Sequence, residues 1–236
     1  VELQGWDPLE DSWELYNLEE DWSQANDLAE EHPEQLERMK QLFLVESARN
    51  KSLPIGGGLW VPLHPEDKPA PPYEQWTFAG PIERMPEFAA PALGNRANTV
   101  TIRAEVPEKA SGVLYALGGF SAGLTCYLED GYLCYEYNLF IIERTTIRSS
   151  QRVPAGPVTI EVASDFEYVG QDLVGDITLS VDGQRVAQGK VPRCAPLMFT
   201  ANECLDLGAD LGSPVSEAYF DRAPFRFSGA LHEASV

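Results

Sequence analysis

A predicted β-hairpin in residues 112–138 constrains the fold of this chain more than any other stretch. Its sequence is GVLYALGGFSAGLTCYLEDGYLCYEYN, and Asp130-Gly131 is a dipeptide typical of two-residue hairpin turns. If these two residues form the turn, three pairs of mainly apolar side chains share one face: Leu128 with Leu133, Cys126 with Tyr135, and Leu124 with Tyr137. A register shift of one residue would turn this set to the opposite face. The stretch therefore predicts a hairpin with one buried side.

The opposite face of this hairpin combines aromatic and polar side chains and is the main candidate for ligand binding. Its four candidate residues are Thr125, Tyr127, Tyr132 and Glu136. Tyrosine rings could stack on a sugar, and the hydroxyl and carboxylate groups could hydrogen-bond to it. Surfaces rich in tyrosine and tryptophan also mark protein contacts. We favour the interpretation that another domain or a proline-rich linker covers this face, with sugar binding as the alternative.

Further strand patterns extend from about residue 76 to residue 236. Strands at this spacing without intervening helices are typical of an antiparallel β-sandwich of the jelly-roll type. We therefore predict a mainly β domain over residues 76–236. The segments that carry the pattern are residues 99–106, residues 158–163, a second hairpin at 176–187 that turns at Asp182-Gly183, and a final strand that begins with Phe225 and Phe227.

Residues 1–50 differ from the rest because their pattern predicts one short strand and one helix. The strand is expected around Trp13 in the stretch WELYNLEED, and the helix from Pro33 to Arg49. The helix carries an apolar stripe at helical spacing, formed by Leu36, Met39, Leu42 and Phe43. One strand and one amphipathic helix cannot close a core, so we expect this α+β segment to pack on the sandwich or on another domain. Residues 51–75 contain three consecutive glycines followed by five prolines, which predicts a linker.

Composition excludes several classes of partner. The formal charge of -20, from 37 acidic and 17 basic residues, argues against nucleic acid and against anionic membrane surfaces. No apolar run approaches the roughly 18 residues that a membrane-spanning helix requires. The four cysteines do not suggest a disulfide scaffold, and the three histidines are scattered along the chain. We therefore predict no zinc site.

Two separate parts of the sequence resemble parts of one family of enzymes. Residues 13–30, WELYNLEEDWSQANDLAE, and the following HPEQLERMKQLF resemble the C-terminal subdomain of type I, formylglycine-dependent sulfatases. Residues 112–138, together with LDLGADLGSPV at 205–215 and FRFSGAL at 225–231, resemble the concanavalin or laminin-G-like sandwich of long bacterial arylsulfatases. The resemblance implies a non-catalytic C-terminal module whose partner is the catalytic domain of the same polypeptide. It also implies that formylglycine and calcium belong to that domain, and that this chain holds no cofactor.

Two possible reactive sites in the sequence are interpreted without a catalytic role. The sulfatase nucleophile lies in a C-x-P-x-R motif, but the C-x-P sequence at Cys194 is followed by Met198 in place of the arginine. A thioether cannot supply the positive charge that holds an anionic sulfate. Glu143 and Arg144 are interpreted as a surface ion pair. We therefore assign no catalytic residue to this chain.

An acidic stretch near the C-terminal end could bind calcium, as some laminin-G-like domains do. Its three carboxylates lack the spacing of a dedicated calcium loop, so we favour a solvated acidic turn and predict no metal site. The residues concerned are Glu203, Asp206 and Asp210.

Three functions are compatible with these observations. The first is a structural module that supports the catalytic domain of an arylsulfatase-like sulfate-ester hydrolase. The second is a carbohydrate-binding module that recognises a glycan, including a sulfated one. The third is a glycosidase, which would need two carboxylates facing each other across a substrate cleft. Glu129 and Glu136 would form only a weak pair of this kind, so we favour the first function and keep the second as its alternative.

Overall fold

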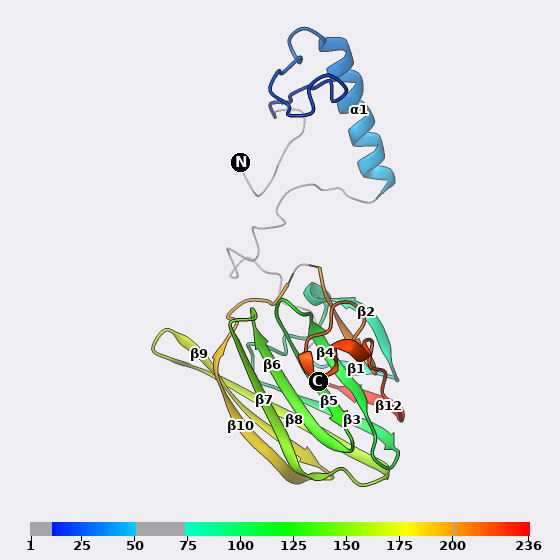
Figure 1. Cartoon of the computed structure of the whole chain (residues 1–236), viewed down its shortest axis with the longest axis vertical. Helices are drawn as coiled ribbons and strands as arrows, with labels where there is room; N and C mark the ends of the chain where they lie inside the picture. Colours follow the sequence, from blue (N-terminus) through cyan, green and yellow to red (C-terminus); the bar gives the residue numbers. More distant parts are fainter. Residues whose placement is uncertain (1–10, 51–73, 201) are drawn as a thin grey trace. The chain divides into compact units, whose positions relative to one another are not determined.

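The computed structural model describes residues 11–50, 74–200 and 202–236. The chain divides into two compact units, Val1–Pro69 and Ala70–Val236, which we describe separately (Figure 1). Nearly all of the linker predicted at residues 51–75 lies outside the described residues. Within the described part of the chain, no helix is long and apolar enough to cross a bilayer.

The first unit contains one helix, α1 (Pro33–Arg49), at the position predicted from the sequence. The strand predicted around Trp13 is wrong, because residues 11–32 contain no strand. Local contacts take the place of a strand partner. The backbone N–H of Leu15 donates to the carboxylate of Asp27 (2.9 Å), and its carbonyl accepts from the N–H of Leu28 (2.8 Å).

The apolar stripe of α1 is buried only in part. Phe43 lies edge-on to the ring of Trp13, with ring centroids 5.3 Å apart. By contrast, the side chains of Met39 and Leu42 are 47% and 57% exposed, and the Trp22 side chain is 87% exposed. The first unit therefore presents apolar side chains that the described residues do not cover.

The second unit is a β-sandwich of two six-stranded antiparallel sheets, which confirms the predicted mainly β, jelly-roll fold (Figure 1). Sheet A has the strand order β1-β12-β3-β8-β9-β10, and sheet B has the order β2-β11-β4-β5-β6-β7. The strands of sheet A are β1 (Thr77–Phe78), β12 (Ala230–Ser235), β3 (Asn98–Val106), β8 (Gly156–Val169), β9 (Asp172–Val181) and β10 (Gln184–Cys194). The strands of sheet B are β2 (Ile82–Pro86), β11 (Cys204–Leu207), β4 (Gly112–Gly118), β5 (Gly123–Glu129), β6 (Tyr132–Leu139) and β7 (Glu143–Arg152). Two short 3-10 helices, η2 (Glu87–Ala89) and η3 (Glu217–Arg222), lie in the connections.

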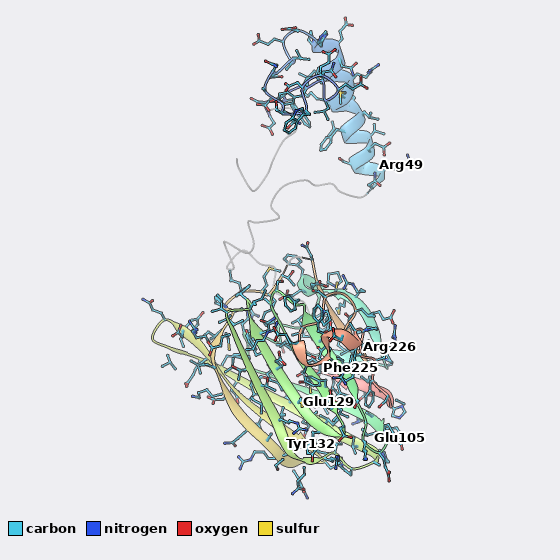
Figure 2. All side chains as sticks on the ribbon, viewed as in Figure 1. Arg49, Glu105, Glu129, Tyr132, Phe225 and Arg226 are labelled. Carbon is cyan, nitrogen blue, oxygen red and sulfur yellow. The ribbon has the colours of Figure 1, made fainter. Side chains whose placement is uncertain are left out.

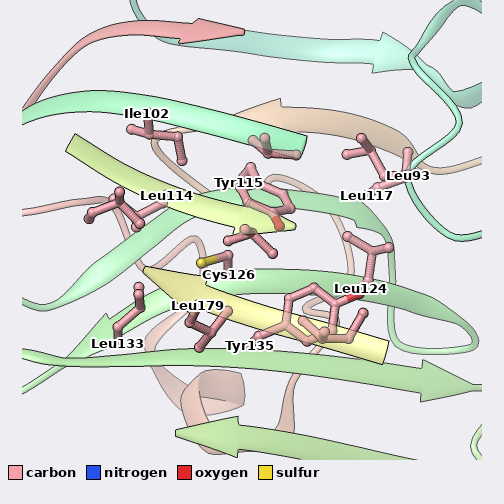
Figure 3. Packing of buried hydrophobic residues seen from close by; sticks show 14 of the residues in the cluster. Leu93, Ile102, Leu114, Tyr115, Leu117, Leu124, Cys126, Leu133, Tyr135 and Leu179 are labelled. Atoms are coloured by element: carbon pink, nitrogen blue, oxygen red, sulfur yellow. The ribbon is translucent and has the colours of Figure 1, made fainter. Parts of the chain in front are cut away.

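The β5–β6 hairpin has the predicted register. Asp130 and Gly131 form its turn with φ angles of 50° and 83°, as a type I′ turn requires. The apolar face of the hairpin packs between the sheets, where Cys126 and Tyr135 meet Leu179 of sheet A in one hydrophobic core (Figure 3). The side chains of the other face therefore point away from this core, as the alternation predicts.

The hairpin between β6 and β7 has a turn that the residue types in the sequence do not predict. Its central residues are Phe140 and Ile141, with φ angles of 49° and 64°. The backbone N–H of Ile142 donates to the carbonyl of Leu139 at 2.9 Å and closes the turn. Positive φ at both central positions normally selects asparagine, aspartate or glycine. This turn is therefore made by two apolar residues in an unfavourable conformation.

The final strand begins at Ala230, so the predicted start at Phe225 is wrong. Phe225 has a φ of 42°, a left-handed conformation that an extended strand does not adopt. Its carbonyl accepts a hydrogen bond from the N–H of Val113 (2.8 Å), and Phe227 donates to the carbonyl of Gly208 (2.9 Å). Both residues therefore belong to a segment that runs beside β4, with Phe225 in the apolar cluster outside sheet B and Phe227 packed against the core between the sheets.

Candidate functional site

Residues 208–227, which we call the cover segment, lie over the outer face of sheet B. The segment includes η3, drawn in orange near β4 and β5 in Figure 1. Besides the hydrogen bond to Val113, its Gly208 N–H donates to the carbonyl of Leu114 at 2.9 Å. The ring of Tyr219 lies edge-on to Tyr127 at 5.2 Å and stacks on Phe225 at 5.0 Å. A second, smaller apolar cluster therefore forms outside sheet B.

Three of the four predicted binding residues lie beneath the cover segment. Thr125, Tyr127 and Glu136 are only 0%, 3% and 5% exposed, so a ligand cannot reach them in this conformation. The face is covered, as we favoured, but by a segment of the sandwich itself. Tyr132 lies outside the covered area, nearer the β5–β6 turn, and is partly exposed (Figure 2). Ligand binding by the four residues stays a prediction.

Glu136 anchors the cover segment through a buried ion pair. Its carboxylate accepts hydrogen bonds from Arg144 (3.0 Å) and from the hydroxyl of Ser216 (2.5 Å). Arg144 also donates to the carbonyl of Val215 at 2.6 Å, so β6, β7 and the cover segment meet at one guanidinium. The predicted Glu143–Arg144 pair is wrong, because neighbouring side chains of a strand point to opposite faces and Glu143 pairs with Arg193 instead (2.9 Å).

The acidic stretch that was predicted to be a solvated turn is largely buried instead. Asp206 and Asp210 are 3% and 1% exposed. Asp206 accepts from the backbone N–H groups of Arg84 (2.5 Å) and Leu211 (3.0 Å), so it ties β2 to the cover segment. Both carboxylates accept hydrogen bonds from backbone N–H groups, and these bonds stabilise them in a buried position. In the described ranges, no group of three or more His, Cys, Asp or Glu side chains is placed to bind a metal ion.

The carboxylate of Asp210, in the cover segment, has a pKa that burial raises. Its Oδ2 atom accepts from the N–H of Val215 (2.9 Å) and from the hydroxyl of Tyr219 (2.7 Å). The same hydroxyl lies 3.0 Å from Oγ1 of Thr125 on β5. Burial raises the pKa of Asp210 from 3.8 to about 6, and the two hydrogen bonds only partly oppose this shift. The cover segment is therefore attached through a carboxylate that titrates in a mildly acidic range.

Tyr132 lies beneath two arginine side chains of β7. The Cζ atoms of Arg148 and Arg152 are 3.9 Å and 4.9 Å from its ring centroid. Arg152 also pairs with Asp130 in the hairpin turn, with an N–O distance of 2.8 Å. Close by, Arg222 of the cover segment pairs with Glu129 at 2.7 Å. This end of the outer face therefore combines an aromatic ring with exposed cations.

An open groove lies in the second unit where β1, β12 and β3 begin or end. Its volume is about 920 Å³, and Trp76 lines it. The backbone of Trp76 exchanges two hydrogen bonds of 3.0 Å with Val236, and its ring stacks on Phe78 at 6.2 Å. The groove is also lined by polar side chains from three segments: Arg96, Asn98, Thr99, Glu233 and Ser235.

The residues that line this groove were not among the binding residues predicted from the sequence. Trp76 was visible as an isolated aromatic residue at the start of the strand-rich region, but its polar neighbours are far away in sequence. Only the antiparallel pairing of β12 with β1 and β3 brings Glu233 and Ser235 next to Trp76 and Thr99.

Comparison with known proteins gives a likeness of fold only. No protein-family model matches the sequence, and no curated protein matches it. Solved structures with a similar fold include domains LG4-5 of the mouse laminin alpha1 chain, at 15% identity and a TM-score of 0.42, over 71% of this chain and 42% of that one. The galectin LEC-6 of Caenorhabditis elegans matches at 13% identity and a TM-score of 0.41, over 67% of this chain and 93% of its own. The receptor binding domain of botulinum neurotoxin type G matches at 8% identity and a TM-score of 0.41, over 69% of this chain and 42% of that one.

The second unit is a mainly β jelly-roll sandwich by its own two antiparallel sheets, and the laminin G and galectin structures are similar to it in fold alone. None of the structures named above is a sulfatase, so the link to sulfatases stays a hypothesis. The laminin and neurotoxin chains are each matched over less than half their length.

Proposed function

We propose that the second unit is a carbohydrate-binding module and that the groove beside Trp76 holds the saccharide. The observation that carries the proposal is the pairing of an indole with several hydrogen-bonding side chains in one groove of about 920 Å³. Ligand sites of small molecules typically have volumes of roughly 300–1,000 Å³ and combine aromatic walls with a few placed polar groups. The C–H face of a sugar ring stacks on an aromatic side chain while its hydroxyls bind polar neighbours.

The rigidity of the groove supports this proposal. The two backbone hydrogen bonds and the stacking on Phe78 hold Trp76 in one place, so its ring loses little freedom when a ligand binds. Glu233 lies 3.4 Å from Arg103, an ion pair that orients its carboxylate at the edge of the groove. Thr125, Tyr127 and Glu136 have a different role in this proposal, because they attach the cover segment.

Calorimetric titration of the full chain with a panel of neutral oligosaccharides tests the proposal. Trp76→Ala is expected to weaken the binding of a recognised oligosaccharide at least about tenfold, because it removes the central aromatic contact. Trp22→Ala is the matched control, since it removes an exposed indole from the first unit. The proposal fails if no oligosaccharide binds, or if Trp76→Ala and Trp22→Ala leave the affinity equally unchanged.

A second candidate function is the structural module of a sulfatase-like hydrolase. The exposed side chains of Met39, Leu42 and Trp22 favour it, since exposed apolar groups of this kind commonly mark a protein contact. In this candidate the first unit packs on the catalytic domain of the same polypeptide, which would also contain the formylglycine and the calcium ion. Sequencing the reading frame upstream of the codon for Val1 tests it. An open frame that encodes C-x-P-x-R supports it, and a stop codon contradicts it.

A further inference from the structure

The outer face of β7 carries a cationic site that is separate from the groove. Arg148 and Arg152 both extend over the ring of Tyr132, with Cζ atoms 3.9 Å and 4.9 Å from the ring centroid. Tyr132 is labelled near the lower end of the second unit in Figure 2. Both guanidinium groups therefore lie within cation-π distance of one ring.

An irregularity of the β-ladder brings the two arginines to one ring. Tyr132 pairs with Arg152 and Cys134 with Arg148, so two steps along β6 correspond to four steps along β7. The hydroxyl of Ser149 stabilises this bulge, because it donates to the carbonyl of Gln151 (2.7 Å) and accepts from the N–H of Leu133 (3.0 Å). Bulges redirect side chains and are frequent next to functional sites. The convergence of the two cations is therefore built into the sheet.

The charges of the two arginines are balanced differently. Arg152 donates to both the carbonyl and the carboxylate of Asp130, at 2.8 Å each. Arg148 is exposed, and among the described residues no carboxylate lies within ion-pair distance of it. Most other arginines of the second unit do have such a partner, as Arg222 has in Glu129. In a chain with 37 acidic residues, Arg148 lies on an aromatic ring and beside the thiol of Cys134, and no described carboxylate occupies its planar fork of hydrogen-bond donors.

We propose that Arg148, seated on Tyr132 and supported by Arg152, binds an oxyanion group, either a carboxylate or a sulfate ester, on a sparsely charged saccharide. Guanidinium groups bind such groups with two parallel hydrogen bonds. The aromatic ring and the bulge hold the fork in place before the ligand arrives. Asp130 and Glu129 border the site, and the whole chain carries a charge of -20. A polyanion would be repelled within the Debye length of about 8 Å, so a ligand with isolated charges is favoured.

The test is titration of the full chain with glucose, glucuronate and glucose 6-sulfate at low and at physiological salt. We expect glucuronate or glucose 6-sulfate to bind and glucose to bind at least about tenfold more weakly at this site. The comparison of the two charged sugars distinguishes a carboxylate from a sulfate ligand. Arg148→Gln is expected to reduce the affinity for the charged sugar about tenfold or more, and Arg148→Lys to restore only part of it, because lysine lacks the planar fork.

Arg185→Gln is the matched control, because it removes one charge from another arginine of the same sandwich that has no carboxylate partner among the described residues, only a hydrogen bond to Gln188 (2.6 Å). Trp76→Ala separates the two proposals, since it should weaken binding in the groove at least about tenfold and leave the affinity for the charged sugar unchanged. Equal losses in Arg148→Gln and Arg185→Gln would show a general effect of charge and overturn the proposal. Binding of neither charged sugar at millimolar concentration would also overturn it.

Discussion

The attachment of the cover segment predicts an unusual dependence of stability on pH. Burial raises the pKa of Asp210 from 3.8 to about 6, a difference of about two units. One unit corresponds to 1.36 kcal/mol, so the linked free energy is about 3 kcal/mol. Because the folded pKa is raised, the folded state binds the proton more tightly than the unfolded state. This contribution to the free energy of unfolding is fully present below about pH 4 and is lost as the pH rises through about 6.

The substitution Asp210→Asn removes this titration and keeps the shape of the side chain. Both hydrogen bonds of Asp210 go to Oδ2, so the amide oxygen of an asparagine placed there can accept from Val215 and Tyr219. Near pH 4 the variant should be about as stable as the parent, or less stable by the loss of local fit. Between pH 4 and pH 7 its relative stability should rise by up to about 3 kcal/mol.

Urea unfolding followed by circular dichroism at half-unit pH steps measures this difference. The neighbouring carboxylates of Asp206 and Glu203 are present in both proteins, so their contributions largely cancel in the comparison. Tyr219→Phe is a useful control, because it removes one hydrogen bond to Asp210 without removing the carboxylate, and the pH dependence should persist. A stability difference between Asp210→Asn and the parent that is constant from pH 4 to pH 7 would refute the reasoning.

Two further predictions concern positions where the chain departs from simple rules. Arg144→Met leaves the buried carboxylate of Glu136 without its cation, and we expect a loss of about 3–5 kcal/mol in the free energy of unfolding at neutral pH. The double variant Glu136→Gln/Arg144→Met should recover part of this lost stability, because it removes the unpaired charge. Equal losses of unfolding free energy in the single and double variants, measured by the same urea titration, would contradict this prediction. Replacing Phe140 and Ile141 with Asn-Gly should raise the free energy of unfolding by about 1 kcal/mol or more, because each left-handed apolar residue costs about 1–2 kcal/mol. An unchanged or lower denaturation midpoint would show that the conformation of this turn is compensated by its contacts.

A contrast between three of the hairpin turns shows what can be predicted from the sequence. Asp130-Gly131 and Asp182-Gly183 carry residues that favour positive φ, so both hairpins were predicted correctly, the first with its register. The register of the second hairpin shifts between Arg185 and Ala187, which the turn dipeptide does not predict. The third hairpin places Phe140 and Ile141 in the same conformation, and no local preference announces it. Helix α1 was predicted with its correct bounds because its start and its period are local signals. The prediction of a strand around Trp13 was wrong because a strand needs a neighbouring strand to pair with, and the local pattern does not show whether one is present.

The candidate site illustrates the same limit for long-range contacts. Thr125, Tyr127 and Glu136 have the residue types of a sugar-binding face, but the same hydroxyl, ring and carboxylate groups also suit the attachment of a covering segment. Which role applies depends on whether residues 80 or more positions away in sequence return to the face, as Ser216 does to Glu136. The alternation of the hairpin could predict that the face is turned away from the core, but not that it is covered.

The two proposed binding sites make a joint prediction about independence. Trp76 precedes β1 of sheet A, whereas Tyr132 and Arg148 lie on β6 and β7 of sheet B. Substitutions that share no partners and lie far apart normally have additive effects within about 0.3–0.5 kcal/mol. A charged monosaccharide can occupy only one site at a time. The effects of Trp76→Ala and Arg148→Gln on its affinity should therefore be independent. A long oligosaccharide whose affinity fell in each single variant by much more than the affinity of a monosaccharide at the same site would instead engage both sites at once, since each contact raises the effective concentration of the ligand at the other.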